Sequence, residues 1–300
     1  MLLNCHSYYS LNYGCLSIQE LLATCQFLGH KTVALTDINN TSECFTFLLL
    51  AKEYNIHPVV GIDFRNGVDQ QFVALAQNHQ GFFELNEFLW HHQSNGIAIP
   101  ERAQFKNAIT IYPFEKALHF DELGETEFTG IAPEELNRPI FKQYKKLFQQ
   151  KLVALCTATF RNKKDFNTHR LLRAIGENTL LSKLGKNQQA KESNKYRSTE
   201  EIKALYEYHS ELIERSDKLL KSCKFEFEFN KPNNKANYTK SHEEDVQLLR
   251  KLSYEGLPYR YDFNPLLGKR LTSKQQEILN RVENELKVIL IVQLGIGIFL

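Results

Sequence analysis

Short apolar segments that end in polar residues alternate with helical patterns over the first 64 residues, and this alternation restricts the fold more than any other feature. Strands are expected at Leu2–His6, Thr32–Thr36 and Pro58–Phe64. A helix with a Ser-x-x-Glu capping box is expected from Ser17 to about Leu28, and a second helix over Ser42–Tyr54. Strands and helices that alternate in this way indicate β/α units.

Each of the three strands leads into a side chain that could bind a metal or a hydrogen-bond partner. His6 ends the first, Asp37 directly follows the second, and Asp63 lies near the end of the third. In a β/α barrel, such residues meet at one rim. His6, Asp37 and Asp63 are therefore the candidate metal ligands. Three ligands are few for a site of two or three ions, so hydrogen bonding within the rim is the favoured role, and no catalytic residue is predicted.

The pattern continues beyond residue 64 and predicts a barrel of about seven strands. The later expected strands are Gln71–Ala76, Ile109–Tyr112, Glu127–Ile131 and Lys151–Cys156. A helix is expected from about Lys163 to Ile175, and His169 on it is expected to pack or to form a local hydrogen bond. The fold class is therefore α/β, a distorted seven-stranded β/α barrel with a parallel sheet.

The second half of the chain indicates a change of domain. Residues 184–195 are polar and aperiodic, which predicts a flexible loop. The barrel domain is expected to span residues 1–225, with a loop and helical extension from about 177, and residues 226–300 to form a linker and amphipathic helices. Those helices are expected at Glu243–Tyr259 and Thr272–Ile289.

Composition limits the class of protein. Hydrophobic residues make up 42% and charged residues 24% of the 300, as in soluble globular proteins, and the net charge of +2 gives no overall signal for nucleic acid. Six cysteines without a Cys-x-x-Cys pair are typical of free thiols in a reducing cytoplasm. The start carries no signal-peptide pattern, and the apolar run Val288–Leu300 is too short to span a membrane. A cytoplasmic protein with no membrane partner is expected, and the apolar end suggests truncation.

The strand ends resemble those of a PHP (polymerase and histidinol phosphatase) domain. In that family the first strand ends His-x-His, the second Thr-Asp-His-Gly and the third Gly-x-Glu. Asn4 stands here at the first histidine, Ile38 at that of the second motif and Asp63 at the glutamate. A later Asp-x-His motif corresponds to Thr157 and Thr159. The resemblance implies a metal-site scaffold that has lost much of its donor set, with Zn²⁺ or Mn²⁺ at low occupancy if at all.

The resemblance is more specific to the bacterial DNA polymerase III alpha subunit. Asn78–Leu85, Thr168–Ile175, Leu249–Tyr261 and Arg281–Ile289 follow its motifs in order. This implies that residues 226–300 lead into a polymerase palm. The chain lacks the Asp-x-Asp carboxylates that hold Mg²⁺ in such a palm, so it should not polymerise DNA alone.

Two main functions remain open from the sequence. The favoured one is a non-catalytic scaffold in DNA replication, whose partners would be the rest of the polymerase alpha chain, possible proofreading exonuclease or other replisome subunits, and DNA through the parent protein. The alternative is a metal-dependent 3′–5′ exonuclease or phosphoesterase that uses His6, Asp37 and Asp63. The near-neutral charge disfavours a third function, a module that only binds nucleic acid.

Overall fold

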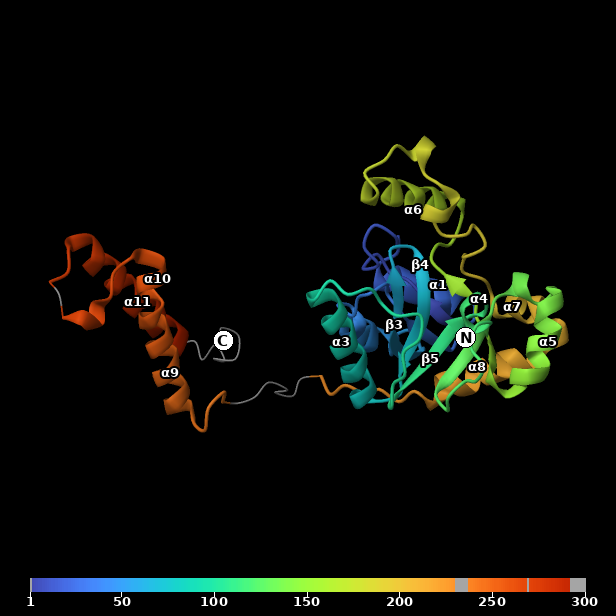
Figure 1. The fold of residues 1–300 in the computed structure, drawn as a ribbon, viewed down its shortest axis with the longest axis horizontal. Helices are drawn as coiled ribbons and strands as arrows, with labels where there is room; N and C mark the ends of the chain where they lie inside the picture. The colour runs from blue at the N-terminus through green and yellow to red at the C-terminus, as the bar shows by residue number, and fades with distance from the viewer. Residues whose placement is uncertain (1, 230–236, 269, 292–300) are drawn as a thin grey trace. The chain divides into compact units, whose positions relative to one another are not determined.

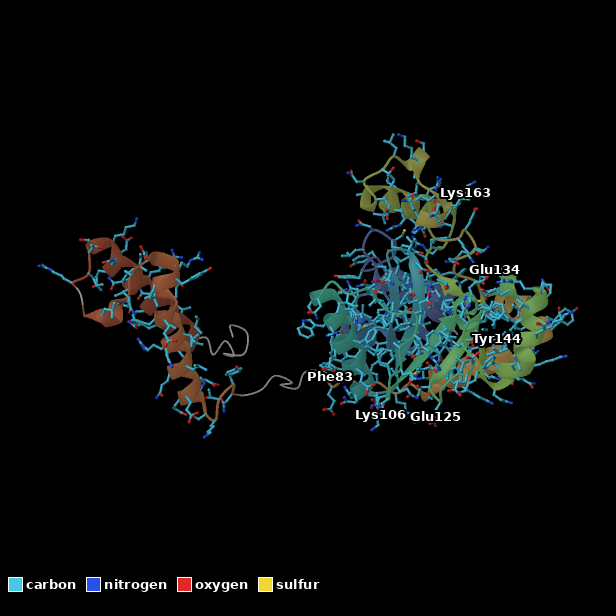
Figure 2. The ribbon with its side chains drawn as sticks, in the orientation of Figure 1. Phe83, Lys106, Glu125, Glu134, Tyr144 and Lys163 are labelled. Carbon is cyan, nitrogen blue, oxygen red and sulfur yellow. The ribbon has the colours of Figure 1, made fainter. Side chains whose placement is uncertain are left out.

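The computed structural model describes residues 2–229, 237–268 and 270–291 (Figure 1). The chain divides into two compact units, Met1–Phe227 and Glu228–Leu300. The first unit carries the sheet, and side chains crowd its interior (Figure 2).

Within the described residues, the first unit has one sheet of eight strands in the order β7-β6-β5-β4-β3-β2-β1-β8. The strands are β1 (Leu2–Cys5), β2 (Thr32–Leu35), β3 (His57–Asn66), β4 (Asp69–Ala76), β5 (Ala108–Pro113), β6 (Glu127–Ile131), β7 (Leu152–Ala154) and β8 (Thr157–Ala158). Only Leu155 and Cys156 separate β7 from β8, yet these strands lie at opposite ends of that order. The sheet therefore curls until its two edges meet in one short segment, as the predicted barrel requires.

Two details of the sheet differ from the prediction. The strand expected at 151–156 is shorter, as β7, and the two-residue strand β8 follows it, so the described residues form eight strands where about seven are expected. The sheet is also not wholly parallel, because β4 runs antiparallel to both β3 and β5. A two-residue turn joins β3 to β4, and Gly67 in that turn has φ +62°. Glycine adopts this conformation without steric cost, which permits the tight reversal.

The barrel interior is apolar and is completed by a helix. Side chains from six strands form one buried cluster, which Leu220 of α8 and the adjoining Cys223 extend. The helices of the first unit are α1 (Ile18–Phe27), α2 (Cys44–Ala51), α3 (His79–Ser94), α4 (Phe114–Ala117), α5 (Pro139–Phe148), α6 (Lys163–Gly176), α7 (Thr199–Leu205) and α8 (Ser210–Ser222). The short 3-10 helices are η1 (Pro133–Glu135), η2 (Gln149–Lys151), η3 (Leu181–Lys183), η4 (Lys186–Gln188) and η5 (Glu207–His209).

Local signals set several helix ends where the sequence predicts them. The Ser17–Glu20 capping box is present at the start of α1, and Gly29 follows the helix with φ +80°.

The segment 184–195, expected to be a flexible loop, is instead anchored to the barrel. It contains η4, and the Asn194 carbonyl accepts a 2.9 Å hydrogen bond from the Thr159 amide.

The second unit is helical in its described part. It contains α9 (His242–Glu255), α10 (Leu257–Tyr261), η6 (Pro265–Leu267) and α11 (Ser273–Ile291). The helix expected over 243–259 is divided at Gly256. Arg250 and Tyr254 of α9 both donate to Glu283 of α11, which holds these helices together. Most of the apolar run at 288–300 lies outside the described residues.

Candidate functional site

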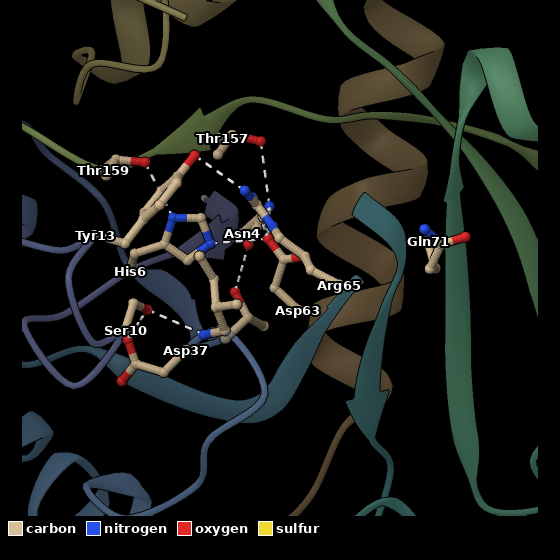
Figure 3. A network of polar contacts seen from close by, with 12 residues as sticks. Asn4, His6, Ser10, Tyr13, Asp37, Asp63, Arg65, Gln71, Thr157 and Thr159 are labelled. Carbon is tan, nitrogen blue, oxygen red and sulfur yellow. Dashed lines mark hydrogen bonds and ion pairs between the residues drawn. The ribbon is translucent and has the colours of Figure 1, made fainter. Parts of the chain in front are cut away.

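One oxygen of the buried Asp63 carboxylate accepts three side-chain hydrogen bonds at the rim of the barrel (Figure 3). The donors are Arg65 Nη2 at 2.6 Å, His6 Nε2 at 2.9 Å and Asn4 Nδ2 at 3.2 Å from Oδ2. Burial by itself would raise the pKa of Asp63, but the Arg65 charge and the His6 hydrogen bond hold that pKa well below its ordinary value. Asp63 is therefore an ionised carboxylate at the centre of a polar network.

Arg65 is fixed at both its side chain and its backbone. The guanidinium also donates from Nη1 to the Tyr13 hydroxyl at 3.0 Å, and its carbon lies 4.9 Å from the centre of the Tyr13 ring. The Arg65 amide donates to Asn39 Oδ1 at 3.0 Å, and the Arg65 carbonyl accepts from Asn39 Nδ2 at 2.8 Å. These contacts place a permanent positive charge beside Asp63.

Asn4 on β1 joins β3, β8 and the residue that follows β2 through its amide group. Its nitrogen donates to Asp63 on β3 and, at 3.2 Å, to Thr157 Oγ1 on β8. Its oxygen accepts a 2.6 Å hydrogen bond from Thr36 Oγ1, directly after β2. Both amide hydrogens and the oxygen of Asn4 are thus engaged, so this residue braces the rim.

The contacts of His6 place a proton on one of its ring nitrogens. Nε2 faces the Asp63 carboxylate, which can only accept, so this nitrogen carries a proton. Nδ1 lies 3.0 Å from Thr159 Oγ1 and can accept from that hydroxyl. The imidazole is therefore held between a carboxylate and a hydroxyl group.

Asp37 organises the loop that follows β1. Its Oδ1 accepts from the Ser7 amide at 2.7 Å and from Ser10 Oγ at 2.6 Å, and its Oδ2 accepts from Ser7 Oγ at 2.6 Å. Burial raises the pKa of Asp37, and the serine hydrogen bonds oppose that shift. Both oxygens of this carboxylate are consequently occupied by the loop.

His169 takes the structural role expected from the sequence. Its Nε2 accepts from the Ala190 amide at 2.8 Å, so Nδ1 carries the proton and donates to the Tyr13 carbonyl at 2.7 Å. Burial lowers the pKa of His169 to about 4, which favours this neutral form. The helix α6 and the segment after it are thereby attached to the loop that carries Tyr13.

A cavity of about 230 Å³ lies next to the network, and Arg65 and Thr157 contribute to its lining. Glu135 also lines it, and burial raises the pKa of that carboxyl to about 7. Two buried atoms of the network, Asp63 Oδ1 and Arg65 Nε, have no hydrogen-bond partner among the described residues. Oδ2 of Asp63 thus accepts three hydrogen bonds, whereas Oδ1 accepts none from the described residues.

The structure brings together only part of the predicted set. His6 and Asp63 are in direct contact, whereas Asp37 is bound to Ser7 and Ser10. The expectation from sequence omitted Arg65 and Tyr13, although the guanidinium is the closest partner of Asp63. A signal was available, because Asp63 and Arg65 stand two residues apart and such residues point to the same side of a strand.

The donor set at this rim does not fit a metal cluster. In the part of the chain that the structure describes, no group of three or more His, Cys, Asp or Glu side chains is arranged to hold a metal ion. At this rim stand the neutral side chains of Asn4, Thr157 and Thr159, and the Arg65 guanidinium lies against the Asp63 carboxylate. Neutral amide and hydroxyl groups are poor ligands for Zn²⁺.

Comparison with known proteins agrees with the fold and the motifs. The family model of the PHP domain matches residues 3–257. The chain belongs to the PHP-domain family. PHP domains generally bind metal ions, whereas no group of side chains among the described residues of this chain is arranged to hold one.

A curated relative links this PHP domain to a polymerase over part of its length. The DNA polymerase III subunit alpha of Ureaplasma parvum serovar 3 is 37% identical over 83 residues. The match covers 28% of this chain and 8% of the relative. The polymerase similarity is thus local, while the PHP match extends over most of the chain.

Two further observations concern the hydropathy of the helices and the state of the cysteines. Across the described segments, no helix is long and apolar enough to cross a membrane. All six cysteines are free thiols, and five of them are buried.

Proposed function

We propose that the chain is the N-terminal PHP domain of a cytoplasmic DNA polymerase III alpha subunit and acts in DNA replication as a non-catalytic scaffold. The observation that carries the proposal is the Asp63 network, because Asn4, His6 and Arg65 all donate to one oxygen of that carboxylate. The local similarity to a polymerase III alpha subunit supports the replication context.

The partner of such a scaffold would be the polymerase itself. Nucleotidyl transfer would reside in a palm with its own Mg²⁺-binding carboxylates, and contact with DNA would come through that palm. The order of motifs through α9 and α11 supports a direct continuation into such a domain. A proofreading exonuclease or another replisome subunit would be a further partner of the assembled polymerase.

The first test concerns catalysis. The purified chain is incubated with single-stranded DNA labelled at its 5′ end and with a chromogenic phosphate ester, in separate reactions containing Mg²⁺, Mn²⁺, Zn²⁺ or EDTA. We expect no metal-dependent hydrolysis of either substrate. Hydrolysis that EDTA abolishes, and that His6→Ala also abolishes while the variant remains folded, would favour the exonuclease or phosphoesterase function instead.

The second test concerns the scaffold role. The chain is mixed with the palm-containing remainder of a DNA polymerase III alpha subunit, supplied as a separate polypeptide, and the mixture is examined by size-exclusion chromatography with light scattering. We expect a 1:1 complex and a gain in primer extension over the remainder alone. Separate elution of the two polypeptides would contradict the scaffold proposal.

A further inference from the structure

Arg65 occupies the place beside Asp63 where a metal-dependent rim would need a cation (Figure 3). We propose that Arg65 is a built-in cation, which neutralises Asp63 permanently and prevents a divalent metal ion from binding there. The inference concerns the chemistry of the rim and stands independently of a role in replication.

The charges of Asp63 and Arg65 balance each other inside the protein. Asp63 is fully buried and Arg65 only 6% exposed, so each charge needs the other. The 2.6 Å separation of Nη2 and Oδ2 leaves no space for an ion between these atoms, since metal–oxygen distances are themselves about 2.0–2.6 Å. A divalent ion bound nearby would also be repelled by the guanidinium, which does not lose its proton in proteins.

The hydrogen bonds of the neighbours support the same proposal. His6 Nε2 directs its proton at Asp63, so this nitrogen has no lone pair to offer while the network is intact. The Asn4 oxygen is engaged by Thr36. Asp63 Oδ1 is the buried acceptor that has no partner among the described residues. The hydrogen-bond donors thus point at Asp63, and the charge of this carboxylate is already neutralised by Arg65.

Removal of the guanidinium should convert this rim into a metal-binding one. Asp63 would keep its charge without a buried counter-ion, and the His6 imidazole would remain beside it as a second side chain of a metal-binding type. A carboxylate and an imidazole then face the volume left by the guanidinium, with Oδ1 free. Divalent metal would therefore stabilise the variant although it does not stabilise the native chain.

The test is thermal unfolding of the full 300-residue chain in EDTA and in millimolar MnCl₂ or ZnCl₂. We compare the native chain with Arg65→Met, with the charge-conserving Arg65→Lys, and with Arg102→Met. Arg102 pairs with the buried Glu127 away from the network, so this variant controls for the loss of any Arg–carboxylate pair. Metal content of each protein after dialysis is measured by elemental analysis.

We expect Arg65→Met to unfold at a lower temperature in EDTA than the native chain. Metal at about 100 times its dissociation constant should then raise the melting temperature of Arg65→Met by about 5 °C or more. The native chain, Arg65→Lys and Arg102→Met should not respond. The proposal is overturned if the native chain holds stoichiometric metal, or if folded Arg65→Met responds no more than Arg102→Met.

A double variant covers the case in which Arg65→Met does not fold. In Asp63→Asn combined with Arg65→Met both charges are removed, so we expect this protein to fold and to ignore metal. If the double variant folds and Arg65→Met alone does not, the result supports the proposal that Arg65 balances the charge of Asp63. A double variant as unstable as Arg65→Met alone overturns it.

Discussion

Arg65 and Asp63 lie two residues apart on β3 and form a buried ion pair, with Nη2 and Oδ2 separated by 2.6 Å. The pair belongs to a network with side chains on three strands, and Asn4 of β1 extends it from β3 to β8. A local contact within one strand thus anchors a network that reaches from β3 to the edge strand β8. Stability of the rim should depend on this pair more than on surface ion pairs.

Asp63→Asn should reduce the free energy of unfolding by about 3–5 kcal/mol, because the substitution leaves the buried Arg65 charge without its counter-ion. Urea denaturation monitored by circular dichroism measures the effect. Asp69→Asn is the matched control, since Asp69 lies on the neighbouring strand β4 with 61% of its side chain exposed and pairs with Lys116. That control should cost less than about 1 kcal/mol. Equal costs for both variants would show that the buried pair has no special role.

Asp37→Asn should loosen the loop that follows β1. The substitution replaces an acceptor of three hydrogen bonds from Ser7 and Ser10 with a group that accepts at one atom only. We expect a loss of about 1–3 kcal/mol and faster hydrogen exchange of the Ser7 amide. Asp121→Asn, at an exposed position, is the control. Unchanged exchange at Ser7 would mean that Asp37 does not order the loop.

The sequence is sufficient to predict most strands and several helices, because apolar segments, caps and turn residues act locally. The Ser17 capping box and the strand at Glu127–Ile131 illustrate this, since each depends on residues close together in the chain. The direction of β4 was not predicted. The Asn66–Gly67 dipeptide could have indicated the hairpin, because such pairs favour tight reversals.

The candidate site was predicted only in part, since its chemistry depends on contacts between distant residues. His6 and Asp63 were named from their places at strand ends, and they meet. The sequence could not show that Asp37 turns to Ser7 and Ser10, because a carboxylate at a strand end has several neighbours within reach. Arg65 was overlooked because the expected strand ended at Phe64, one residue before it.

Gly14→Ala should be more harmful than an ordinary glycine substitution in a loop. A Cβ atom at this position would lie 1.7 Å from the Ser7 carbonyl oxygen, so the backbone of the loop would have to move. We expect a loss of at least about 2 kcal/mol in the free energy of unfolding. Gly67→Ala provides the comparison, because its Cβ would meet open space and only the φ of +62° opposes it, at a cost of about 1 kcal/mol. Equal losses in the two variants would contradict the close approach at Gly14.

His169 should make the stability of the fold depend on pH in a defined window. Its pKa is lowered to about 4 by burial, while the unfolded chain should titrate near pH ~6.5. Between these values the unfolded chain binds more protons than the native one, so stability decreases as the pH falls. The contribution of neutral His169 to the free energy of unfolding is complete above pH ~6.5 and is lost progressively toward pH ~4. This contribution amounts to roughly 3 kcal/mol at most.

The measurement is urea denaturation of the native chain and of His169→Gln at several pH values across this window. Burial also lowers the pKa of His30 to about 4, and it raises that of Glu135 to about 7, which gives a pH dependence of opposite sign. Both groups are present in each protein, so the difference between the two proteins isolates His169. We expect that difference to be largest above pH ~6.5 and to shrink as the pH falls, because acid progressively removes the contribution that the native chain owes to neutral His169. If the difference in free energy of unfolding between the two proteins stays constant across the window, His169 titrates alike in the folded and unfolded chains. Its hydrogen bonds to Tyr13 and Ala190 would then not favour the neutral ring.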